Sequence, residues 1–217
     1  MALNTLYLVR HGHTIWHETG GIAGRTDIDL SDRGREAVRQ LARVLGSDFR
    51  PDHWFCSPLA RTRQTCTLLR QGVLDSPGGT IQAPQTAEPM LDKRLVELDF
   101  GDWEGLTWSH VNEHYEHQMQ QWGADWINRC PPNGESFSQQ VERCREWLAD
   151  AQYRLRSVEP ESGAVICHGG TIRALICHCL GWPLSRAMQF KVDPATVCEL
   201  ECSDNGRWLV RRINTTC

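Results

Sequence analysis

Two histidines that follow apolar runs are the residues of this chain best suited to chemistry. The run Leu6–Val9 leads into Arg10-His11-Gly12, and the run Ala164–Cys167 leads into His168-Gly169-Gly170. Short apolar runs of this kind are typical of parallel strands that are covered on both faces. Ligands of open α/β sheets bind beyond the carboxyl ends of the strands, so adjacent strands would bring both imidazoles to one edge.

Arginine and histidine together suit the chemistry of a phosphate ester. Phosphoryl transfer requires that negative charge be held on three equatorial oxygens, and arginine is a permanently charged, fork-shaped donor for such oxygens. A neutral imidazole is a competent nucleophile near neutral pH. The net charge of the chain is −4, so an anionic substrate needs a local basic pocket rather than a generally basic surface.

Four segments resemble the motifs of the histidine phosphatase superfamily, which has the phosphoglycerate-mutase-like fold, and they occur in that family's order. They are Arg10–Thr14, Ser57–Thr65, Leu95–Gly101 and Cys167–Gly170. The resemblance implies that His11 accepts the phosphoryl group, that Glu97 protonates the leaving alcohol and later activates water, and that Arg10, Arg61 and His168 hold the phosphate. Taken singly, each of these residues is as well explained by an ordinary structural role.

The resemblance also implies a set of substrate-binding residues around the phosphate. They are Arg10, Thr14, Gly24, Arg25, Thr26, Arg61 and Gly169. Several of them have a plain alternative: Arg25, like Arg63, is explained as well by a surface charge, and Thr14 by a role in shaping the turn. Asp99, Asp102 and Glu104 lie close to Glu97 and compete with it for the role of the acid. One departure from the family pattern is His17, because many members carry asparagine at that position.

The pattern of apolar residues predicts a three-layer α/β/α sandwich with a mostly parallel central sheet. At 217 residues, a single domain spanning 1–217 is the simplest division, with a helical flap inserted at about 104–132. Ser31 and Ser136 are expected to cap helices, and strands are expected at 53–56, 196–201 and 207–213. Residues 13–30 and 71–89 are expected to form loops.

Within the superfamily, the chain most resembles the alpha-ribazole phosphatases of the cobalamin pathway. The resemblance lies in Leu98–Gly105, in Trp122–Trp126, in Pro131–Phe137 and in the last forty residues. It implies removal of the 5′-phosphate of alpha-ribazole phosphate. The alternatives are a broad-specificity phosphatase of sugar phosphates or phosphoglycerate, a phosphoglycerate mutase, and a non-catalytic member that only binds phosphorylated ligands. Trp108, Trp122 and Trp126 are candidates for an apolar lid over the organic part of the substrate.

Composition excludes several other partners. The chain starts without the features of a signal peptide and has no run long enough to span a membrane, so a cytoplasmic enzyme is expected, either monomer or homodimer. Nothing favours nucleic acid or membrane as partner, and no cofactor is implied. The cysteines are expected to be structural thiols. His110, His114 and His117 have the spacing of metal ligands on one helix face, but a polar helix is the favoured interpretation, so no metal site is expected.

Overall fold

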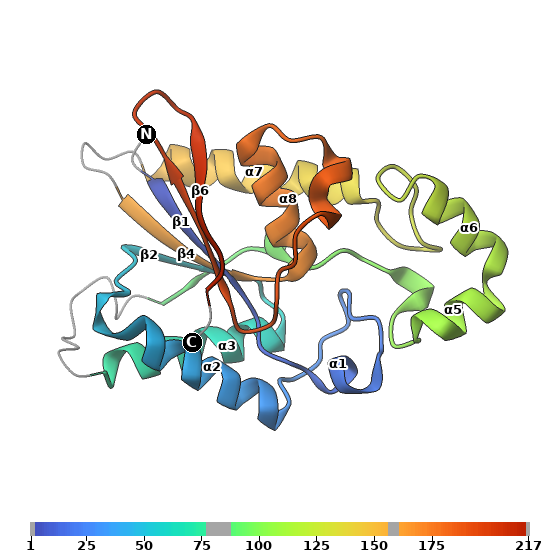
Figure 1. The fold of residues 1–217 in the computed structure, drawn as a ribbon, viewed down its shortest axis with the longest axis horizontal. Helices are drawn as coiled ribbons and strands as arrows, with labels where there is room; N and C mark the ends of the chain where they lie inside the picture. The colour runs from blue at the N-terminus through green and yellow to red at the C-terminus, as the bar shows by residue number, and fades with distance from the viewer. Residues whose placement is uncertain (1–2, 77–87, 156–160, 216–217) are drawn as a thin grey trace.

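A six-stranded sheet forms the centre of the computed structural model, which describes residues 3–76, 88–155 and 161–215 (Figure 1). Its strands are β1 (Leu3–Arg10), β2 (His53–Cys56), β3 (Met90–Leu91), β4 (Glu161–Cys167), β5 (Val197–Cys202) and β6 (Trp208–Thr215). Their order across the sheet is β3-β2-β4-β1-β5-β6. The first four strands in that order pair in parallel, whereas β5 is antiparallel to both of its neighbours. The mostly parallel sheet expected from the sequence is confirmed.

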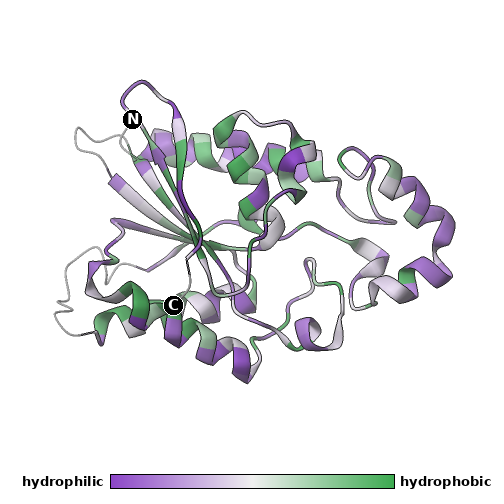
Figure 2. Ribbon diagram, viewed as in Figure 1, coloured by the Kyte–Doolittle hydropathy of each residue, from purple (hydrophilic) through white to green (hydrophobic). Residues whose placement is uncertain are grey.

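Helices cover both faces of this sheet (Figure 1). On one face lie α2 (Asp32–Leu45) and α3 (Ala60–Leu74), and on the other lie α7 (Phe137–Arg154) and α8 (Gly169–Leu180). Successive side chains of β1 point to opposite faces, so Leu6 and Leu8 join the core under α7 and α8, while Val9 joins the core under α2 and α3. Figure 2 shows the resulting apolar strands between helices that are polar on their outer sides.

Serine caps set the starts of two of these helices. The Ser31 hydroxyl accepts a hydrogen bond from the backbone N–H of Gly34, and Ser136 forms a capping box with Gln139 at the start of α7. These are the caps that the sequence predicted. Helix α3 continues to Leu74, so only part of the predicted 71–89 loop is loop. Residues 77–87 of that loop lie outside the described residues.

A short helix, α1 (Ile15–Thr19), lies within the predicted 13–30 loop. His17 stands where a capping box usually has Glu or Gln, with its Nδ1 2.8 Å from Thr14 Oγ1, and Gly20 ends the helix in the left-handed conformation. Because histidine is not the usual residue at this position of a capping box, the sequence did not predict the start of this helix. Single turns of 3-10 helix also occur at Gly46–Asp48, Lys93–Leu95, Gly101–Trp103 and Leu184–Met188.

Helices α5 (Trp108–His114) and α6 (Glu116–Ala124) extend away from the sheet, at the right of Figure 1. They have a small core of their own, formed by Ile22, Trp103 and Val111. The segments on either side of them are held together: Glu135 N donates to Asp99 O at 2.9 Å, and Asp102 N donates to Pro132 O at 3.0 Å. This pairing anchors the base of the projecting helices beside the sheet edge.

Candidate active site

The carboxyl ends of β1 and β4 bring the two histidines together. Arg10 and Cys167 are register partners, and His11 N donates to Cys167 O at 3.1 Å. Beyond these ends, the His11 and His168 rings lie with their centroids 5.1 Å apart, and both side chains are buried. The residues are 157 positions apart, so the parallel pairing of the two strands alone places them side by side.

The hydrogen bonds of His11 determine which of its nitrogens is free. Nδ1 lies 2.7 Å from Gly12 O, and because a carbonyl only accepts, Nδ1 carries the proton. Nε2 therefore has a lone pair, which accepts from Arg61 Nε at 3.3 Å. Burial, followed by the charges of Arg61 and Arg10, holds the pKa of His11 well below its usual value. The ring is thus neutral, with Nε2 available as a nucleophile.

Arg61 is fully buried at the start of α3, and backbone carbonyls fix its guanidinium. Nη1 donates to Thr26 O at 2.9 Å, and Nη2 donates to Gly24 O at 2.6 Å. Two of the predicted substrate-binding residues, Gly24 and Thr26, therefore contribute carbonyls that orient Arg61. Burial lowers the pKa of Arg61, and the Glu97 carboxylate opposes this fall most strongly among its neighbours.

His17 holds the other arginine of the site. Arg10 donates through Nη1 to Val192 O at 2.5 Å and through Nη2 to His17 Nε2 at 3.0 Å. Since a guanidinium only donates, His17 Nε2 is the acceptor, and Nδ1 lies 2.8 Å from Thr14 Oγ1 and 3.2 Å from Thr14 N. Burial and then the Arg10 charge lower the pKa of His17 to about 4. This neutral histidine orients Arg10, and it also occupies the Thr14 hydroxyl.

His168 occupies the N-cap position of α8, and its side chain has one hydrogen-bond partner among the described residues. Its Nε2 lies 2.8 Å from Ser57 Oγ, and among the described residues no partner is found for its buried Nδ1. Burial, together with Arg61 and His11, holds the pKa of His168 well below its usual value. Ser57 was part of the second motif in the sequence, but its contact with this histidine depends on the adjacency of β2 and β4.

The carboxylate of Glu97 is held by three N–H donors. Oε1 accepts from Leu98 N at 2.8 Å and from Gln140 Nε2 at 3.1 Å, and Oε2 accepts from Gly170 N at 3.0 Å. The N–H of Gly170 at the start of α8, next to the predicted substrate-binding Gly169, is therefore occupied by Glu97. The charge of Glu97 also opposes the burial-driven lowering of the pKa of Arg10, so the carboxylate acts on both arginines.

Glu104 holds the segment Gly24–Thr26, which we call the mouth segment. It accepts from the backbone N–H groups of Arg25 and Thr26, each at 2.7 Å, and from the Thr26 hydroxyl. A Cβ on Gly24 would lie 2.1 Å from Glu104 Oε1, so only glycine allows this approach. The Arg25 side chain forms ion pairs with Asp99 and Glu135, at 3.3 and 3.2 Å.

Sequence reasoning missed two positioning residues of this site, Gln140 and Arg143. Gln140 is buried against Glu97, and Arg143 donates to the carbonyls of Val96 and Glu97 at 2.8 and 3.0 Å. A signal for Gln140 was present, because it falls on the apolar face of its helix, three residues after Phe137 and four before Cys144. A polar residue at such a position needs a buried partner.

The predicted lid tryptophans have mostly structural surroundings. Trp122 stacks on Trp108 at 5.8 Å between ring centroids and meets Trp103 edge-on at 5.6 Å, within the small core of the projecting helices. Trp126 packs on Phe137 against the main core. Trp108, at 40% exposure, is the one of the three predicted lid tryptophans that presents substantial surface.

The histidines with metal-like spacing do not share one helix. Helix α5 ends at His114 and α6 begins at Glu116, which separates His117 from His110 and His114. In the described ranges, no group of three metal-ligating side chains is found. Every cysteine within those ranges is a free thiol that forms no disulfide. No helix of the described part is both long and apolar enough to cross a bilayer.

Comparison with known proteins agrees with this geometry. The family model for the histidine phosphatase superfamily (branch 1) matches residues 6–216. The chain is 31% identical to the adenosylcobalamin/alpha-ribazole phosphatase of Escherichia coli, over 87% of this chain and 85% of that protein. It is 27% identical to phosphoserine phosphatase 1 of Hydrogenobacter thermophilus, over 98% of this chain and 92% of that protein.

A solved structure shares the fold over nearly its whole length. The alpha-ribazole phosphatase from Shigella flexneri superposes with a TM-score of 0.81 at 25% identity, covering 97% of this chain and 96% of that one. The elements that carry His11, Arg61, Glu97 and His168 lie within this shared architecture.

Proposed function

Because the chain belongs to the histidine phosphatase superfamily and is a phosphatase, we propose that it hydrolyses small phosphomonoesters through a phosphohistidine on His11, with alpha-ribazole 5′-phosphate as its substrate. The observation that carries the proposal is the state of His11. Its Nδ1 proton is held by Gly12 O, and its Nε2 lone pair is aimed at Arg61. A neutral nucleophile beside a buried, permanently charged donor is what in-line attack on a phosphate dianion requires.

In the first step, His11 Nε2 attacks phosphorus and the bond from phosphorus to the ester oxygen breaks. Glu97 enters this step in its acid form, with the proton on Oε2, and gives that proton to the ester oxygen, so the product leaves as a neutral alcohol. Arg10 and Arg61 bind the phosphate oxygens, with Arg61 Nε–H turning from His11 to the phosphate as the N–P bond forms. His168 Nδ1, the buried nitrogen for which the described residues offer no partner, is the donor available to a third oxygen.

In the second step, water attacks phosphorus and the N–P bond breaks. Glu97, now a carboxylate, takes the proton of that water and is ready for the next cycle. Both arginines remain charged throughout and so stabilise both transition states.

The substrate part of the proposal is supported by the relatives named as alpha-ribazole phosphatases and by Trp108. Ile22 forms backbone hydrogen bonds with Leu106 and Gly105, and Gly21 forms a β-bridge with Thr107. These contacts place helix α5, which begins at Trp108, beside the mouth segment. We interpret residues 104–132 as a flap beside this mouth segment. An exposed indole offers a flat apolar surface to a benzimidazole.

Trapping the intermediate tests the mechanism. Rapid quench of the wild type with ³²P-labelled substrate should yield protein-bound phosphate that is labile in acid and stable in base. His11→Ala should yield neither label nor turnover, because no other residue is assigned to accept the phosphoryl group. Turnover near the wild-type level in His11→Ala would refute the proposal.

A panel of esters tests the substrate. The value of kcat/KM should be highest for alpha-ribazole 5′-phosphate when compared with phosphoserine, sugar phosphates, phosphoglycerate and p-nitrophenyl phosphate. Trp108→Ala should raise KM for the ribazole ester about tenfold and leave p-nitrophenyl phosphate within about twofold. Equal values across the panel would favour a broad-specificity phosphatase, and a preference for phosphoserine would favour the activity in the name of the Hydrogenobacter relative.

A further inference from the structure

Gln140 is a buried amide on α7 that contacts the proposed catalytic acid. It is 0% exposed, and its Nε2 donates to Glu97 Oε1 at 3.1 Å and to Thr171 Oγ1 at 3.2 Å. In the described part of the chain, no donor is found for its carbonyl oxygen Oε1. A buried amide with one unpaired end on an apolar helix face lowers the stability of the protein. Its presence at this position therefore calls for a functional explanation.

The neighbours determine which way this amide points. Thr171 Oγ1 donates its own hydrogen to Val96 O at 2.9 Å, so it presents a lone pair to Gln140. The Glu97 carboxylate presents another. Reversing the amide would place a carbonyl oxygen against two acceptors, which is repulsive, so Nε2 must face Glu97.

Counting lone pairs on the Glu97 carboxylate identifies its free position. Each oxygen has about two lone-pair sites. Both sites of Oε1 are used, by Leu98 N and Gln140 Nε2, while the one donor to Oε2 from the described residues is Gly170 N. The free site is therefore on Oε2.

We propose that Gln140 is a positioning residue that occupies Oε1 of Glu97 and so directs proton exchange with the leaving alcohol and with water to Oε2. This proposal rests on the acid role of Glu97 in the proposed function. The start of α8 supports it, because a Cβ on Gly170 would lie 2.3 Å from Glu97 Oε1 and 3.0 Å from Gln140 Oε1. Carboxylate and amide are thus held together in the space left by a glycine.

Leaving-group dependence separates this role from a structural one. The p-nitrophenolate ion departs readily without a proton, whereas an alkoxide needs one, so only alkyl esters require a well-placed acid. Gln140→Met keeps the length of the side chain and removes both polar ends. We expect kcat/KM to fall about tenfold for glycerol phosphate and by less than about twofold for p-nitrophenyl phosphate. The same change at the exposed Gln120 of α6 is the control and should alter neither value.

A double-mutant cycle with Glu97→Gln completes the test. Glu97→Gln alone should show the same split between the two esters, but larger, and adding Gln140→Met should cause no further loss. Equal losses on both esters in Gln140→Met, or losses that multiply in the double variant, would overturn the positioning role. Equal losses on both esters in Glu97→Gln would instead overturn the acid role itself, and with it the proposed mechanism.

A second variant guards against a folding defect in Gln140→Met. Gln140→Asn keeps the amide but withdraws it by one methylene, so it should show the same split between the two esters. If both variants keep the wild-type thermal midpoint and treat the two esters alike, Gln140 only tethers α7 to α8.

Discussion

At the scale of single residues, the site depends on imidazoles that stay neutral beside permanent charges. Burial and the arginines lower the pKa values of His11, His17 and His168. For His11, neutrality preserves the nucleophilic lone pair. For His17, it preserves the acceptor that holds Arg10.

His17 should make folding stability depend on pH. In the unfolded chain it binds a proton near pH 6.5, and in the folded protein only near pH 4, so the unfolded state binds more protons between these values. Stability contributed by the neutral ring is present above pH 6.5 and is lost as the pH falls toward 4. We expect His17→Asn to reduce the loss of unfolding free energy between pH 7 and pH 4 by about 1–2 kcal/mol, allowing for partial exposure.

Urea unfolding at both pH values measures this effect. His110→Asn, on the exposed face of α5, is the matched control and should leave the pH dependence as in the wild type. Identical pH dependence in His17→Asn and the wild type would contradict the assignment of His17 as a neutral acceptor.

At the scale of elements, the Glu104 carboxylate links the segment that leads into the projecting helices to Arg61. Glu104 holds the backbone of Arg25 and Thr26, and the carbonyls of Gly24 and Thr26 hold Arg61. The mouth segment therefore lies between the Glu104 carboxylate and the Arg61 guanidinium. Hydrogen bonds to its backbone hold both side chains in place. Arg61 is oriented before any substrate arrives.

Glu104→Ala should release the mouth segment and loosen Arg61. Because Arg61 binds the phosphate of every substrate, kcat/KM should fall about tenfold for alkyl and aryl esters alike, and inhibition by orthovanadate should weaken in parallel. This uniform loss is opposite to the split expected for Gln140→Met. Glu113→Ala, exposed on α5, is the control. An unchanged vanadate affinity in Glu104→Ala would contradict the linkage.

The break between α5 and α6 leads to a prediction about metals. Because Tyr115 interrupts the helix, His117 does not share a face with His110 and His114, so the three do not form a ligand set. Dialysis against EDTA should leave kcat/KM unchanged, as measured with p-nitrophenyl phosphate before and after treatment. A loss of activity that zinc restores would contradict this.

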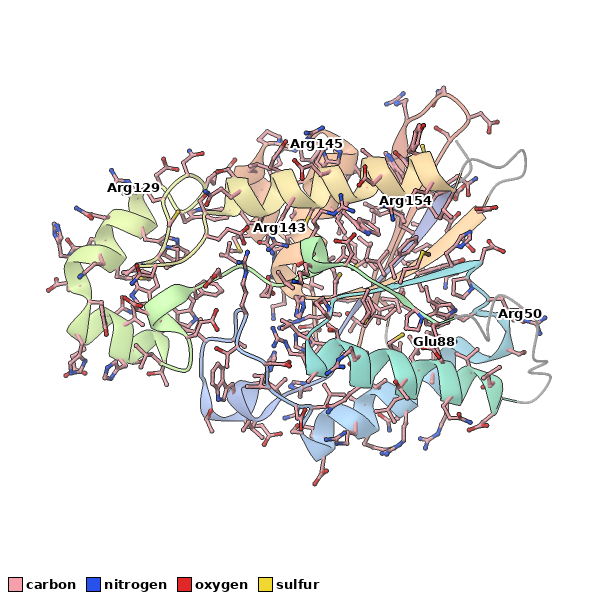
Figure 3. The ribbon with its side chains drawn as sticks, turned by 180° about the vertical axis from the view of Figure 1, so that it is seen from behind. Arg50, Glu88, Arg129, Arg143, Arg145 and Arg154 are labelled. Atoms are coloured by element: carbon pink, nitrogen blue, oxygen red, sulfur yellow. The ribbon has the colours of Figure 1, made fainter. Side chains whose placement is uncertain are left out.

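At the scale of the whole molecule, Arg143 joins segments that are far apart in the chain. It forms two hydrogen bonds with Glu135, at 2.8 and 2.9 Å, and reaches the backbone carbonyls of Arg94, Val96 and Glu97. Figure 3 shows it between α7 and the segment that carries Glu97. Since Glu135 also pairs with Arg25, a half-buried group of charges connects the mouth segment, the acid segment and α7.

Removing this arginine should destabilise the protein strongly. Arg143→Met removes both of its hydrogen bonds to Glu135 and one donor from each of three carbonyls, and because the pair is half-buried we expect a loss of about 2–3 kcal/mol, below the range for a fully buried pair. Arg145→Met is the matched control, because Arg145 is exposed and pairs only with Glu142 one turn away, so it should lose at most about 0.5 kcal/mol. Denaturant unfolding measures both, and equal losses would contradict the prediction.

The sequence by itself determined the class of fold and the chemistry. Apolar runs of strand length and amphipathic helices between them predict the layered sheet, because burial on both faces demands that pattern. Arg10, His11, Arg61, Glu97 and His168 were recognisable because their motifs are local. Their roles followed from the resemblance of four motifs in the family's order, because each residue taken singly is as well explained by an ordinary structural role.

The tertiary structure decided which atoms are free and which residues hold them. Gln140 lies 43 residues from Glu97, and Glu104 lies 79 from Arg25, so no local pattern could pair them. The tautomer of His11, the acceptor role of His17 and the structural surroundings of Trp122 likewise depend on neighbours that only packing supplies. A hydrogen bond requires atoms about 3 Å apart in a suitable direction, and in this chain the sheet and its helices set those distances.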